Sequence, residues 1–140
     1  MKGRLEHANI RVRSLDDAVD FLLTAIPSFR IRGEGVGSDG RRWMHVGSDD
    51  SYLALSEAPS PRDESDSLRW HGVNHLGFEV DDAESVKRRL EAKGYREGFV
   101  AEPHPYRKRI YFLDRDGNEW EFVEYFTDDA AKRNDYSRVS

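Results

Sequence analysis

The strongest constraint on the fold is a strand pattern that occurs twice in the chain. The segment starting at His7 reads His-Ala-Asn-Ile-Arg-Val, and the segment starting at His75 reads His-Leu-Gly-Phe-Glu-Val. Both follow the pattern His-x-x-apolar-x-Val, and such alternation is typical of half-buried β-strands. Recurrence of the pattern from position 7 to position 75 of a 140-residue chain indicates that one structural module is duplicated.

Each repeated strand is followed by the same order of elements. After the first, Ser14 suits a helix N-cap and Pro27 ends the helix. Three strands are then expected over residues 28–36, 41–46 and 51–56, separated by glycines. The apolar positions of the predicted helix are Ala18, Val19, Leu22 and Ile26.

The second half, after a strand over residues 73–80, repeats this order. Asp81 or Asp82 caps a helix that carries Val86 and Leu90 on one face, and Gly94 suits its C-terminal end. Further strands are expected over 97–101, 109–113 and 119–126, the last two joined by a tight turn at 116–118.

These elements predict an α+β fold in which two βαβββ modules form a curled mixed sheet around a central cavity. We expect one domain over residues 1–140, made of a module over 5–57, a linker over 58–72, a module over 73–126 and a polar tail over 127–140. The linker is assigned because it is rich in Pro, Ser, Asp and Glu, and the tail has at most a short helix near 129–133.

Composition excludes several classes of function. The formal net charge of -5 argues against general nucleic-acid binding, which needs a basic face. No apolar run approaches the roughly 18 residues that span a bilayer, and the start of the chain does not read as a secretory signal, so a cytoplasmic protein with no membrane partner is expected. The sequence has no cysteine, which excludes disulfides and thiolate ligands.

Strand alternation predicts a metal site. His7, His75 and Glu121 each fall on the strand face opposite the apolar residues that pack under a helix, so all three are expected to point into the cavity. Two imidazoles and one carboxylate suit a single divalent ion, which can be Fe, Mn, Zn, Ni or Co, and they leave positions open for substrate. The alternative is that each histidine is an ordinary hydrogen-bonded strand residue. Spacing puts Ala54 where a fourth ligand would stand, so three protein ligands are predicted.

The pattern resembles the vicinal oxygen chelate superfamily, which includes glyoxalase I, extradiol dioxygenases, fosfomycin-resistance enzymes and bleomycin-binding proteins. The resemblance lies in the strands that start at His7 and Val73 and in the segment 112–121, Phe-Leu-Asp-Arg-Asp-Gly-Asn-Glu-Trp-Glu. It implies a glyoxalase-like fold, often in a homodimer, with His7, His75 and Glu121 as metal ligands and a small-molecule substrate that chelates the metal through adjacent oxygens.

Departures from the family pattern narrow the implied activity. Glyoxalase I usually has a glutamate where Ala54 stands, and the serine-containing loop of fosfomycin thiol transferases is replaced by residues 102–109. Extradiol dioxygenases usually use a further histidine as acid or base, a role open to His104 or His45. The bleomycin-binding branch lacks the metal triad.

Other residues are candidates for contact with the substrate. In the basic segment 104–109, Arg107 and Arg109 are suited to bind an anionic group, and Tyr106 or Tyr111 to orient or protonate an oxygen. Trp43 and Tyr52 are candidates to line the cavity. The alternative is a solvated loop and ordinary core packing.

Two functions of different classes follow. The first is a metalloenzyme acting on a small oxygen-rich substrate, with the metal as a Lewis acid in isomerase, lyase or epoxide-opening chemistry, or in dioxygenase chemistry if it is iron. The second is a non-catalytic small-molecule (drug) binding protein of the bleomycin-resistance type.

Overall fold

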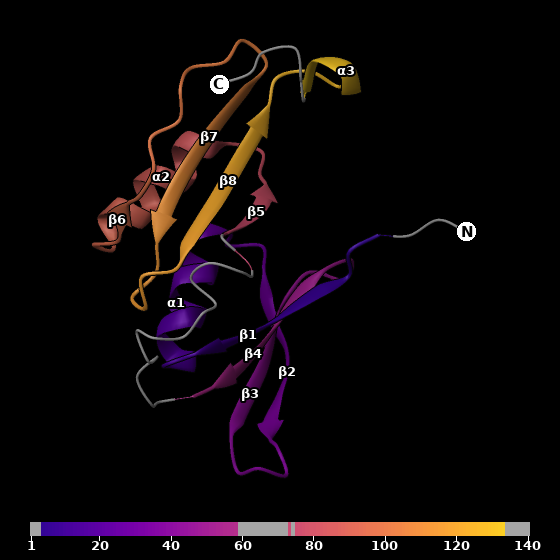
Figure 1. Ribbon diagram of the computed structural model, residues 1–140, viewed down its shortest axis with the longest axis vertical. Coiled ribbons are helices and arrows are strands. Elements are labelled where there is room, and N and C mark those ends of the chain that lie inside the picture. Colours follow the sequence, from indigo (N-terminus) through magenta and orange to yellow (C-terminus); the bar gives the residue numbers. More distant parts are fainter. Residues whose placement is uncertain (1–3, 59–72, 74, 134–140) are drawn as a thin grey trace. The chain divides into compact units, whose positions relative to one another are not determined.

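The computed structural model describes residues 4–58, 73 and 75–133 (Figure 1). The chain divides into two compact units, which are described in turn: unit 1 comprises residues 1–72 with 114–116, and unit 2 comprises residues 73–113 with 117–140. The predicted linker, except for its first residue, lies outside the described residues. Among the described residues, no helix is long and apolar enough to cross a membrane.

The described part of unit 1 contains one helix and a four-stranded mixed sheet. Its elements are β1 (His7–Val12), α1 (Leu15–Ala25), β2 (Arg30–Val36), β3 (Arg42–Gly47) and β4 (Tyr52–Glu57). The strand order is β1-β4-β3-β2, with β1 parallel to β4 and the other pairs antiparallel. The parallel pair is what the connection through α1 predicts, because a helical crossover brings two strands side by side in the same direction.

The predicted cap of α1 is confirmed, but its buried face differs from the prediction. The Ser14 hydroxyl accepts a hydrogen bond from the Asp17 backbone N–H at 3.2 Å, and the helix ends before Pro27. The buried residues are Leu15, Phe21, Leu22 and Ala25. Of the four predicted positions only Leu22 is fully buried, because the helix is rotated to bury the larger ring of Phe21.

Unit 2 repeats the arrangement and adds a short helix. Its elements are β5 (His75–Glu79), α2 (Ala83–Ala92), β6 (Arg96–Glu97), β7 (Arg107–Leu113), β8 (Glu119–Tyr125) and α3 (Ala130–Arg133). The strand order is β5-β8-β7-β6, with β5 parallel to β8. Asp82, rather than Asp81, caps α2, and Gly94 and Gly117 both have the positive φ that their turns require. The α+β fold of two βαβββ modules is thereby confirmed.

Two strands of unit 2 differ from the predicted ranges. β6 has two residues instead of five. The Gly98 backbone N–H still donates to the Tyr111 carbonyl of β7, but that of Phe99 donates to the Glu119 carboxylate at 3.0 Å, which ends the pairing. β7 begins at Arg107, two residues earlier than predicted, because its pairing with β8 extends to Tyr125. The predicted basic loop is therefore partly a strand.

In each unit, a carboxylate from the last strand accepts a hydrogen bond from the first backbone N–H of the unit's helix. Glu57 accepts a hydrogen bond from the Leu15 backbone N–H at 3.0 Å, and Glu124 accepts one from the Ala83 backbone N–H at 2.9 Å. Each helix thus has a glutamate carboxylate at its N-terminal end, where the helix dipole is positive. This correspondence, which no sequence motif had indicated, is further support for duplication.

Candidate metal centre

Each sheet has an open face, which is the face opposite its helix. The strand register within each sheet shows which residues of the two open faces correspond. In unit 1, β1 and β4 pair so that Asn9 faces Ala54; in unit 2, β5 and β8 pair so that Gly77 faces Glu121. Asn9 and Gly77 each lie two residues after the histidine of the repeat. Ala54 is therefore the structural counterpart of Glu121, as the spacing predicted, and a methyl group stands where the second unit has a carboxylate.

Unit 2 brings His75 and Glu121 together. The His75 Nε2 and Glu121 Oε2 atoms are 3.2 Å apart, and the side chains are 33% and 16% exposed. The absence of a side chain at Gly77 makes room for this contact, because a Cβ there would lie 3.2 Å from the same carboxylate oxygen. Both side chains belong to the open face of the sheet, so the pair is accessible to a ligand.

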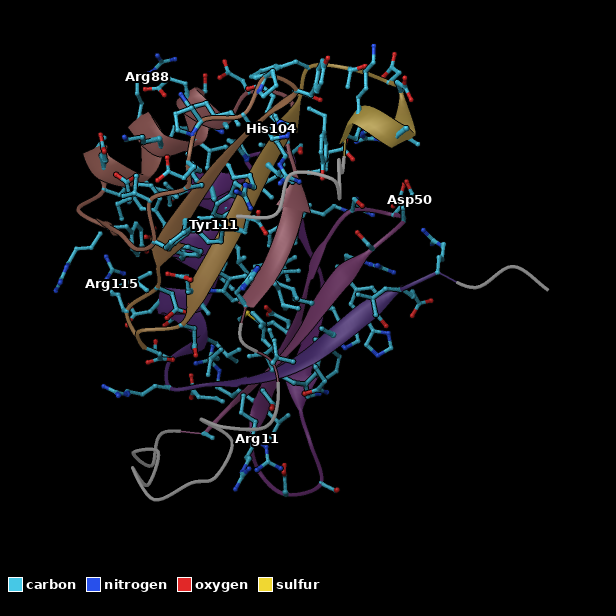
Figure 2. The ribbon with its side chains drawn as sticks, turned by 45° about the horizontal axis from the view of Figure 1, so that its top comes forward. Arg11, Asp50, Arg88, His104, Tyr111 and Arg115 are labelled. Atoms are coloured by element: carbon cyan, nitrogen blue, oxygen red, sulfur yellow. The ribbon has the colours of Figure 1, made fainter. Side chains whose placement is uncertain are left out.

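Tyr111 holds the other oxygen of this carboxylate. Its hydroxyl donates a hydrogen bond to Glu121 Oε1 at 2.9 Å across the β7–β8 pair, and its ring lies edge-on to His75. Tyr111 is labelled in Figure 2. Burial is the largest cause that raises the pKa of Tyr111 to about 12, and the hydrogen bond to the negatively charged Glu121 adds to it. At neutral pH Tyr111 is a neutral hydrogen-bond donor, which fits orientation or protonation of an oxygen and does not fit a general base.

We expect Tyr111 to ionise later than ordinary tyrosines when the pH is raised. Because its folded-state pKa lies above the usual value of about 10, the bond to Glu121 stabilises the fold below pH 10, and this contribution is lost as the pH rises toward 12. A spectrophotometric titration of the phenolate absorbance checks this result. The late-ionising group should disappear in Tyr111→Phe; its persistence there would contradict the assignment.

The donor atoms of this pair fit a divalent metal. Two ligand atoms about 2.1 Å from one ion lie roughly 3 to 3.4 Å apart, and the His75 and Glu121 atoms are 3.2 Å apart. Imidazole nitrogen and carboxylate oxygen are also the donors that first-row divalent metals prefer. No cluster of three or more His, Cys, Asp or Glu side chains that could hold a metal occurs within the described residues. The third predicted ligand, His7, belongs to unit 1.

In unit 1, His7 is part of a row of rings on the open face. Its imidazole stacks on Tyr52 at 4.9 Å, and His45 lies 4.8 Å from Tyr52 and 5.0 Å from Trp43. The Trp43 indole lies against Gly35, where a Cβ would be 2.9 Å from it. The structure thus groups the predicted residues Trp43 and Tyr52 with His7 on the open face of the unit 1 sheet.

The predicted basic patch is divided between the two faces of its sheet. Arg107 and Arg109 share the open face with Tyr111, as their register with β8 requires. Lys108 points to the helix side and pairs with Glu84. Arg109 is the arginine nearer to the His75–Glu121 pair, because it lies two residues from Tyr111 on the same face, whereas Arg107 lies further along the strand and donates to the Arg133 carbonyl.

His104 and Tyr106 lie before the first residue of β7, at the opposite end of that strand from Tyr111. The Tyr106 backbone N–H donates to His104 Nδ1 at 3.1 Å, and Lys132 lies over the Tyr106 ring. His104 is labelled in Figure 2. The structure therefore groups these two residues with each other and with α3, and it places Tyr111 alone of the three beside the His75–Glu121 pair.

Sequence reasoning missed two residues of the site. Gly77 makes room for the Glu121 carboxylate, and its position two residues after His75 was the available signal. Glu6 lies against His7, with 2.8 Å between Oε1 and Nδ1, and the hydrogen bond lowers the pKa of Glu6. Glu6 was expected inside the first strand, over residues 5–12, whereas β1 begins at His7, and its place in the sequence gave no indication of this contact.

A groove of about 400 Å³ lies elsewhere, between α1 and the helix side of the unit 1 sheet. Val19, Ile31 and Met44 line it together with two aspartates. It contains none of the predicted site residues, and it lies on the opposite face of the sheet from His7. The groove is therefore not the site that the sequence predicted.

Comparison with known proteins identifies the family. Residues 4–122 match the family model of the Glyoxalase/Bleomycin resistance protein/Dioxygenase superfamily, and the chain belongs to that superfamily. A probable trivalent organoarsenical cleaving enzyme from Bacillus subtilis is 34% identical over 140 residues, which cover 94% of this chain and 86% of the relative.

Solved structures share the fold. A glyoxylase/bleomycin resistance protein/dioxygenase domain from Frankia superposes with a TM-score of 0.70 at 20% identity, covering 89% of this chain and 99% of that one. A fosfomycin resistance protein from Listeria monocytogenes, complexed with Mn(II) and sulfate ion, gives 0.65 at 17% identity, covering 89% and 93%. At these identities the likeness concerns the fold.

Proposed function

We propose that the protein is a metal-dependent enzyme of the vicinal oxygen chelate type, acting on a small oxygen-rich substrate. The observation that carries the proposal is the His75–Glu121 pair at 3.2 Å, whose carboxylate is held from behind by Tyr111. His7 completes the ligand set in this proposal, on the strength of the repeat and of the family. The organoarsenical relative supports an enzyme, and the Mn(II) complex of the Listeria protein supports a divalent metal in this fold.

Each residue has a distinct task. A bound divalent metal would supply Lewis acidity for isomerisation, lyase action or epoxide opening, or oxygen activation if it is iron. Tyr111 orients Glu121 with its single O–H, and it would direct that O–H to an oxygen of the substrate only by giving up the bond to Glu121. Arg109, two residues along the same face, binds an anionic group of the substrate. Trp43 and Tyr52 contact its less polar part.

If the substrate is an organoarsenical, this chain cannot bind its arsenic through cysteine thiolates. Trivalent arsenic is a soft centre that favours thiolate ligands, and the 140 residues contain no cysteine. If this chain cleaves such a compound, recognition falls to the metal ligands, Arg109 and the aromatic rings. We therefore favour a substrate recognised through oxygen atoms over one recognised through arsenic.

A second candidate is a small-molecule binder without metal chemistry. The row of rings from Trp43 to His7 favours it, because such a surface binds flat drug-like molecules without a metal. In either case we propose a homodimer, as the family resemblance implies.

Metal content decides between the two candidates. We expect untagged protein to contain close to one divalent ion per chain by elemental analysis, or to take one up on incubation with Fe(II), Mn(II), Zn(II), Ni(II) or Co(II). The identity of the ion then directs substrate screening, with iron pointing to oxygenation and the others to isomerase or addition chemistry. Protein that binds none of these ions contradicts the enzyme proposal and favours the binder.

A further inference from the structure

The Glu6 carboxylate determines which nitrogen of His7 carries the proton. Glu6 Oε1 and His7 Nδ1 are 2.8 Å apart. An ionised carboxylate only accepts hydrogen bonds, so the N–H of a neutral imidazole in this contact is on Nδ1. The lone pair is then on Nε2, the nitrogen that points away from Glu6. A histidine binds a metal through such an unprotonated nitrogen.

Neighbouring groups also restrain the His7 ring. Tyr52 faces His7 in the β1–β4 register, and the two rings stack with an angle of 13° between their planes. The Arg32 guanidinium lies 4.1 Å from the centre of the Tyr52 ring. These contacts matter because β1 is an edge strand and the His7 side chain is 45% exposed, so the protein core does not hold the ring.

We infer that Glu6 is a positioning residue for His7, holding the imidazole in the tautomer and orientation in which Nε2 binds the metal. The inference rests on the proposed function, in which His7 is a ligand. A carboxylate on the distal nitrogen of a ligating histidine also makes that histidine a stronger donor. In this proposal Glu6 and Tyr111 have the same role. Each bonds the ligand atom that does not face the metal, which is Nδ1 of His7 for Glu6 and Oε1 of Glu121 for Tyr111.

The test uses the full chain and two readouts. The first is the tautomer of His7 in metal-free protein, read from long-range ¹H–¹⁵N spectra about two pH units above the ordinary imidazole pKa, with the signal assigned by its loss in His7→Gln. The second is the affinity for Mn(II), from the electron paramagnetic resonance signal of the free ion. The variants are Glu6→Ala and Glu6→Gln. Glu34→Ala, which removes an exposed carboxylate from β2 of the same unit, is the control.

We expect an Nδ1–H tautomer in the wild type, and in Glu6→Ala a shift toward the Nε2–H form with Mn(II) affinity about 10- to 100-fold weaker. Glu6→Gln should retain the tautomer and most of the affinity, because its amide oxygen still accepts from Nδ1. Glu34→Ala should change neither readout. An unchanged tautomer and affinity in Glu6→Ala, while His7→Gln loses Mn(II), would overturn this inference alone. If His7→Gln still binds Mn(II) normally, the proposed ligand set itself is wrong.

Discussion

Replacing Glu121 with glutamine is expected to remove nearly all metal binding, with an affinity for Mn(II) at least about 100-fold weaker than that of the wild type. Removing a residue that only hydrogen-bonds to a metal ligand typically weakens metal affinity 10- to 100-fold. The loss should be larger for Glu121, which is proposed as a direct ligand. Glutamine has nearly the same size and can still accept the Tyr111 hydrogen bond, so the fold should be retained. Titration of the metal-free protein with Mn(II) measures the change.

Glu119→Gln is the matched control for this substitution. Glu119 is on the same strand and the same face as Glu121, and its backbone lies opposite His75 in the register, but its carboxylate accepts the Phe99 backbone N–H. We expect its Mn(II) affinity to stay close to that of the wild type. Equal losses in the two variants would show that strand charge, rather than the His75–Glu121 pair, determines metal binding.

The largest effect on stability is expected from Phe122→Ala, which should lower the free energy of unfolding by about 3–5 kcal/mol. Phe122 is fully buried on the helix side of β8 and stacks on Phe78. Its removal leaves a cavity between the sheet and α2 that the packed neighbours cannot fill. Urea denaturation followed by circular dichroism gives the value.

Phe99→Ala is the corresponding control, since the Phe99 side chain is 58% exposed and touches Tyr111 only edge-on. We expect it to cost less than about 1 kcal/mol, as is usual at exposed positions. If the two substitutions cost the same, the core of unit 2 is not where the structure places it.

The strands that carry the proposed ligands could be predicted because the signals that define them are local in the sequence. Alternation puts His75 and Glu121 on faces opposite their apolar neighbours, and positions that need a positive φ, such as Gly94 and Gly117, are recognisable by residue type. The spacing argument for Ala54 succeeded for the same reason, since a duplicated register repeats itself.

The features that were missed depend on contacts between distant segments. The rotation of α1 toward Phe21 is decided by how well that ring fills the space against the sheet, which periodicity does not contain. The start of β7 is decided by the length of β8, its partner. Lys108 looked like part of one basic patch, but strand pleating sends it to the opposite face from Arg107 and Arg109.

The parallel pairing of β5 with β8 has a consequence for the order of events during folding. His75 and Glu121 are separated by 46 positions in the chain and meet only when these two strands align across the crossover. Closing so long a loop costs entropy that an isolated ligand pair in the unfolded chain cannot recover. A metal ion would therefore find its site only on a chain that has already folded, and would act by slowing unfolding rather than by nucleating the fold.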